Sequence, residues 1–171
     1  MLPDPLHPMV VHFPIVLVVL LPFFAIGALL IIRRGAAPRR VWLLPVVIAA
    51  ALAASAFVAL RTGEAEEERV ERVVSEDALH AHEEAGERFV VLAGVLLLVA
   101  GAGLAGGALG TAARALTVAG SLVLVAAGVQ VGAAGGELVY EHGAASAYVN
   151  AQTTTPSGAL DFREHDDEDG D

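Results

Sequence analysis

Histidines and a carboxylate flank the long apolar runs of this 171-residue chain, and they are the side chains best suited to chemistry. They stand in "LHPMVVHFP" at residues 6–14, just before the third apolar run, and in "GGELVYEHG" at residues 135–143. Neutral imidazole is the commonest metal ligand and also ligates haem iron, and a carboxylate can join a metal's ligand set. The candidates are His7, His12, His80, His82, Glu137 and His142.

Four apolar runs must position these residues, and they cover residues 10–32, 41–60, 89–109 and 115–138. About 20 apolar residues in a helix span the hydrocarbon core of a bilayer, so each run is long enough to cross it. Mean hydropathy is +0.64, and 56% of the residues are hydrophobic. The first run is too long for a signal peptide, and no Lys or Arg precedes it. We therefore expect an all-α integral membrane four-helix bundle.

The loop "RRGAAPRR" after the first run holds the densest positive charge in the chain. Positively charged short loops stay in the cytoplasm, so this loop and the short loop at residues 110–114 are predicted to be cytoplasmic. An even number of spans then places both termini on the extracytoplasmic side. We expect a multi-pass protein of the cell (plasma) membrane.

Outside the spans the chain is acidic, with a formal net charge of −10. Residues 1–149 are expected to form the membrane domain, in which residues 61–88 are an acidic extracytoplasmic loop containing an amphipathic helix. Residues 150–171 read as a disordered acidic tail. Such acidity argues against nucleic-acid binding. The absence of cysteine excludes disulfides, iron–sulfur clusters and covalently attached haem.

All of these candidates map to one face of the membrane, and helix geometry separates His80 from His82. A helix turns about 100° per residue, which places His80 about 200° from His82. One stripe runs into the third span through His82, Gly86, Phe89 and Ala93. We therefore predict that His82 faces the bundle and that His80 does not.

The first and last spans give further expectations for the candidate residues. Pro8 disfavours a continuous helix through His7, so the helix is predicted to begin near His12, with His7 on an extended lead-in. A carboxylate in a membrane segment is costly, so Glu137 is expected to face the interior with a partner. His142 precedes Gly143, which is also typical of a simple helix end.

The motifs "LHPMVVHFPIVL", "RTG" and "GGELVYEHG" resemble those of a bacterial family of predicted four-helix membrane proteins of unknown function. The resemblance covers residues 6 to about 148. It implies a membrane location, and it marks a set of motif positions. It suggests a redox context because some relatives are fused to cytochrome c domains. The motif positions are His7, His12, Gly136, Glu137, Tyr140, His142 and Gly143.

Three functions remain open from the sequence. The first is binding of b-type haem for electron transfer, with His82 and either His12 or His142 as axial ligands and Gly86, Gly135 and Gly136 making room. The second is a transition-metal site, whose ligands would come from His7, His12, His82, Glu137 and His142. The third is an accessory or assembly subunit whose polar cluster is structural. Expected partners are the lipid bilayer and a membrane or extracytoplasmic redox protein. Hydrolase motifs are absent, because "HEEAG" lacks the second histidine of HExxH, so a redox carrier or binding protein is favoured over an enzyme.

Overall fold

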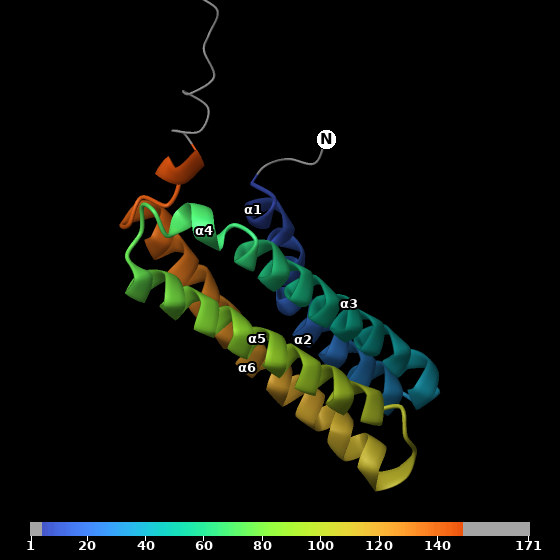
Figure 1. The fold of residues 1–171 in the computed structure, drawn as a ribbon. Helices are drawn as coiled ribbons and strands as arrows, with labels where there is room; N and C mark the ends of the chain where they lie inside the picture. The colour runs from blue at the N-terminus through green and yellow to red at the C-terminus, as the bar shows by residue number, and fades with distance from the viewer. Residues whose placement is uncertain (1–4, 149–171) are drawn as a thin grey trace, which may run out of the picture.

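The computed structural model describes residues 5–148, which form helices joined by short turns. Four of the helices are long and run side by side, and the two short ones lie at one end of the bundle (Figure 1). The helices are α1 (His7–Val10), α2 (His12–Arg33), α3 (Pro38–Glu64), α4 (Glu67–Val70), α5 (Glu76–Ala102) and α6 (Gly107–Tyr140).

The long helices close a ring in which each has two neighbours. Helices α2 and α5 each pack against both α3 and α6, so consecutive helices alternate in direction around the bundle. All four are long and apolar enough to cross a membrane. The predicted all-α membrane bundle is therefore confirmed, whereas the side on which the termini lie stays a prediction.

The two ends of the bundle differ in their polar residues. We call one the histidine end; it comprises α1, the first turns of α2 and α5, the last turns of α3, α4 with its adjoining turns, and the last turns of α6 with the turn that follows. The other is the arginine end, formed by the α2–α3 turn at residues 34–37, the α5–α6 turn at residues 103–106 and the helix turns next to them. Figure 1 shows α1 and α4 together at the first end, far from the two turns of the second.

The core between the helices includes one buried leucine from each of them. Leu21, Leu52, Leu96 and Leu124 are all buried, and small alanines between them let the helices approach closely. Large apolar residues also point outward, and Phe23 and Leu98 expose 69% and 75% of their surfaces. Apolar residues on both faces are expected of helices surrounded by lipid.

One predicted span boundary differs from the structure. The third span ends at Ala102 rather than residue 109, because the turn lies at residues 103–106 and Gly107 takes a positive φ of 67° at the start of α6. Within residues 61–88, α3 continues to Glu64 and α5 begins at Glu76 and runs into the third span. Glycine and alanine fill both sides of the α5–α6 turn, so local composition did not mark it. The predicted tail at residues 150–171 lies outside the described residues.

Candidate functional site

His7 begins α1, and helix α3 holds its imidazole ring. Nδ1 of His7 lies 2.9 Å from the Ala59 carbonyl oxygen and 3.3 Å from Oγ1 of Thr62. Because a carbonyl oxygen can only accept, we assign the proton to Nδ1, which donates it to Ala59. In the neutral ring, Nε2 then keeps a lone pair that can bind a metal.

The backbone around His7 is helical, so the predicted extended lead-in is wrong. Leu6 caps α1 with φ −86° and ψ −36°, and Pro8 stands in the first turn. A proline is tolerated there because the N–H that it lacks has no partner within the helix. The sequence pattern therefore overstated the break that Pro8 causes.

Glu66, between α3 and α4, supplies the acceptor that this helix start needs. Its Oε1 accepts hydrogen bonds from the backbone N–H groups of Leu6 at 2.8 Å and of His7 at 3.0 Å. Its Oε2 accepts one from the Tyr148 hydroxyl at 2.6 Å. A single carboxylate thus joins the first helix, the α3–α4 turn and the segment after α6. Sequence reasoning missed Glu66, because nothing local separates it from the neighbouring glutamates.

His82 lies on the inner face of α5, as the stripe predicted, and the stripe continues into buried Phe89 and Ala93. The side chain is partly buried, and its Nδ1 is fully buried without a hydrogen-bond partner. The carbonyl of Val131 on α6 lies beside the ring. Buried polar atoms nearly always have a partner, so this nitrogen is the exception that the site must explain.

His7 and His82 face each other across the histidine end. Their ring centroids are 6.3 Å apart, and the ring planes meet at 84°, an edge-to-face arrangement. Each ring fills the space beside a glycine: a Cβ added at Gly63 would lie 3.2 Å from His7, and one at Gly135 would lie 3.1 Å from His82. The missing side chains therefore make room for the two imidazoles.

The other histidines at this end do not join the pair. His12, His80 and His142 are all exposed. His80 instead lies 3.6 Å from Glu76 and 3.4 Å from Glu83 on its own helix. His142 lies in the turn after α6, where Gly143 has a positive φ of 72°, which fits the helix-end interpretation. Across residues 5–148, no group of three or more His, Cys, Asp or Glu residues is placed to hold a metal ion.

Glu137 does not face the interior, contrary to expectation, and neither does Gln130. The inward stripe of α6 lies one position away and contains Leu124, Gly128, Val131, Gly135 and Leu138. One residue corresponds to a rotation of about 100°, which is enough to turn Glu137 outward. Glu137 lies near the end of α6, close to the membrane interface, where the free-energy cost of an outward-facing charge is small.

The glycines predicted to make room behave differently from one another. Gly135 contacts the His82 ring, whereas a Cβ at Gly86 would meet only Leu60, at 3.7 Å, and one at Gly136 would meet nothing within 4 Å. Gly63, in the "RTG" motif, was not predicted to border the site. The room for the histidine pair therefore comes from Gly63 and Gly135.

Together these features define a four-helix membrane protein with a partly buried pair of histidines at one end. A family model described as "Predicted membrane protein (DUF2231)" matches residues 3–147, and the chain therefore belongs to this family. No curated protein and no solved structure matches the chain.

Proposed function

We propose that this membrane protein holds one transition-metal centre between His7 and His82 and uses it to exchange electrons with a membrane or extracytoplasmic redox partner. One observation carries the proposal: Nδ1 of His82 is buried without a protein partner, on a ring whose centroid lies 6.3 Å from that of His7. A buried nitrogen with a lone pair is suited to metal binding.

The separation of the two rings fits a shared metal. Metal–imidazole bonds are about 2.0–2.1 Å long, so two imidazoles on opposite sides of one metal place their centroids roughly 6 Å apart. Histidines that bind metals usually donate their second N–H to a carbonyl, which fixes the ring. His7 has this arrangement, with Nδ1 donating to the Ala59 carbonyl oxygen at 2.9 Å.

The number of ligands favours haem over a bare ion. A zinc site normally needs three or four protein ligands, and no group of three His, Cys, Asp or Glu residues in the range 5–148 is placed to hold a metal ion. Haem iron receives four ligands from the porphyrin and needs only two axial imidazoles from the protein. The predicted partners His12 and His142 are exposed, so His7 takes their place as the second axial ligand of the proposal.

The first experiment is a visible spectrum of the protein purified in mild detergent from haem-replete cells, before and after reduction with dithionite. Bound b-type haem gives a Soret band, with sharp α and β bands on reduction. Elemental analysis of the same sample measures iron and copper per chain. Pigment, or about one metal atom per chain, is the expected result for a site with two ligands.

Matched variants test whether this pair holds the centre. His7→Ala and His82→Ala are expected to remove the pigment or the metal, whereas His80→Ala and His142→Ala, at the same end but exposed, should retain it. His82→Met should keep the pigment with a changed spectrum, since methionine also ligates haem iron.

A colourless protein that also fails to take up added haem, iron or copper would contradict the proposal. The remaining function would then be an accessory or assembly subunit with a structural polar cluster. The hydrogen bonds of Glu66 favour that alternative. This carboxylate accepts them from two backbone N–H groups and a tyrosine hydroxyl, and they hold three segments of the chain together. Under it, the histidine variants would change stability alone.

A further inference from the structure

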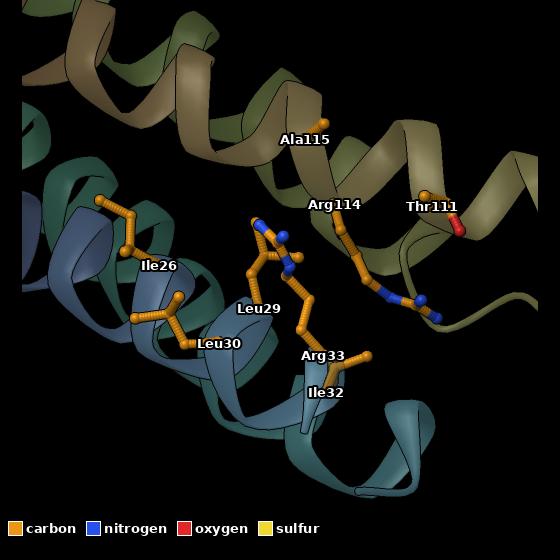
Figure 2. A pocket seen from close by; sticks show the side chains of 8 residues that line it. All are labelled: Ile26, Leu29, Leu30, Ile32, Arg33, Thr111, Arg114 and Ala115. Atoms are coloured by element: carbon orange, nitrogen blue, oxygen red, sulfur yellow. The ribbon is translucent and has the colours of Figure 1, made fainter. Parts of the chain in front are cut away.

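A groove on the outer surface of the arginine end lies between α2 and α6 (Figure 2). Its walls are largely apolar, and Ile26 and Leu30 of α2 remain 41% and 49% exposed there. Arg33 and Arg114 line the same groove. An exposed apolar groove that is also lined by two arginines is suited to a ligand with both an apolar chain and a negative charge.

The positive charge at this end has no acidic counterpart in the surrounding sequence. Five arginines stand near the two turns, and residues 5–63 and 88–136 contain neither aspartate nor glutamate. The Arg33 side chain makes no hydrogen bond or ion pair with any residue in the range 5–148. The five arginines are Arg33, Arg34, Arg39, Arg40 and Arg114. An external anion is therefore the available partner for them.

The two arginines of the groove have different roles. Arg114 is only 6% exposed, and its guanidinium donates to the carbonyls of Gly103 at 2.7 Å and Ala105 at 3.0 Å. It is therefore a fixed positive charge beside the groove. Arg33 is exposed at the end of α2, and in Figure 2 its side chain extends toward α6. Its guanidinium is free to form the two parallel hydrogen bonds that suit a phosphate.

We propose that this groove binds an anionic phospholipid. Arg33 binds the headgroup phosphate within the positive field of Arg114, and an acyl chain lies along Ile26, Leu30 and Ala115. Basic pockets between membrane helices are known to recognise anionic headgroups. A free phosphate ion would leave the apolar walls unused, so the groove favours a lipid over an inorganic anion.

The test measures lipid binding to delipidated protein in neutral detergent, by native mass spectrometry and by the shift in melting temperature. Phosphatidylglycerol is the probe, and phosphatidylcholine is the zwitterionic control. We expect retained phosphatidylglycerol and a raised melting temperature, with no comparable effect of phosphatidylcholine. Glycerol phosphate, which carries the charge without the chains, should compete poorly.

A pair of variants separates a built site from general attraction. Arg33→Gln removes the groove arginine and should weaken phosphatidylglycerol binding about tenfold, the loss expected for a charge-assisted bond. Arg39→Gln removes the same charge at the same end but outside the groove, and should bind like the original protein. Arg33→Lys, which keeps the charge but loses the fork, should fall between them.

Equal weakening by Arg33→Gln and Arg39→Gln would overturn the proposal, because it would show attraction to net charge alone. Equal binding of phosphatidylcholine, or full competition by glycerol phosphate, would overturn it as well. The result does not depend on the histidine pair, so His82→Ala should bind phosphatidylglycerol as tightly as the original protein.

Discussion

The two ends of the bundle differ in whether their buried polar atoms have hydrogen-bond partners. At the arginine end, the buried Trp42 ring donates to the Ala100 carbonyl at 2.9 Å, and Arg114 donates to two carbonyls after α5. At the histidine end, His7 and Glu66 are bonded, but Nδ1 of His82 is buried without a partner. The comparison suggests that the first end is built to hold the turns, and that the second leaves one strong ligand atom available.

Glycine packing separates the ends in the same way. A Cβ at Gly103 would lie 2.3 Å from Nε1 of Trp42, and one at Gly110 would lie 1.9 Å from the Ala105 carbonyl oxygen. At the histidine end, the closest atoms to added Cβ atoms belong to imidazole rings, at 3.1 Å and beyond. Backbone cannot give way as a side chain can, so Gly110 at the arginine end should tolerate a side chain less well than Gly63 or Gly135 at the histidine end.

Gly110→Ala should have the largest effect on stability, because its new methyl group would collide with backbone. Overpacking of this kind costs about 1–3 kcal/mol and occasionally more. We expect a loss of about 3 kcal/mol, seen as a lower melting temperature and altered fluorescence of the single tryptophan. Gly101→Ala is the control, since nothing lies within 4 Å of its Cβ. Similar melting temperatures for the two variants would show that the turn is not locked.

Arg114→Met should have the next largest effect. It keeps much of the apolar stem but removes both hydrogen bonds to the carbonyls after α5. Leaving such acceptors unpaired costs about 1–3 kcal/mol. Hydrogen exchange should rise at residues 103–110, whereas Arg40→Met, which changes an exposed arginine at the same end, should leave exchange unchanged. Unchanged exchange in Arg114→Met would contradict the role of this side chain in holding the turn.

Glu66→Gln tests the histidine end in the same way. The amide has only one oxygen to accept hydrogen bonds, whereas the carboxylate now accepts three through two oxygens. Losing a cap costs about 1 kcal/mol, and bonds to a charged group are worth somewhat more. Hydrogen exchange should therefore rise over residues 6–12 without a change in the core. Glu68→Gln is the exposed control, and equal exchange in both variants would refute the capping role.

Features that depend on local patterns were predictable from the sequence, whereas features that depend on contacts between distant segments were not. The four spans and the inward position of His82 depend on periodicity, which a short stretch of sequence displays. The pairing of His7 with His82, the capping by Glu66 and the anchoring of Arg114 depend on contacts between distant segments or across a turn. The prediction that Glu137 faces the interior was wrong for a different reason. The neighbouring residues are small, so the sequence did not indicate which stripe of α6 faces inward. One residue of register decides that question.

The smallest expected effect is also the sharpest test of the comparison between the ends. In protein purified without haem or metal, His82→Leu replaces a buried, unpartnered nitrogen with apolar atoms, which is often neutral or slightly stabilising. His7→Leu instead removes a hydrogen bond to the Ala59 carbonyl, and it should destabilise the protein by about 1 kcal/mol. Melting temperatures measured without and then with added haem distinguish the two. A loss of stability in cofactor-free His82→Leu equal to that in His7→Leu would mean that His82 is a structural residue. A stable His82→Leu that cannot take up haem would show that the nitrogen is retained for binding, at some cost to the empty protein.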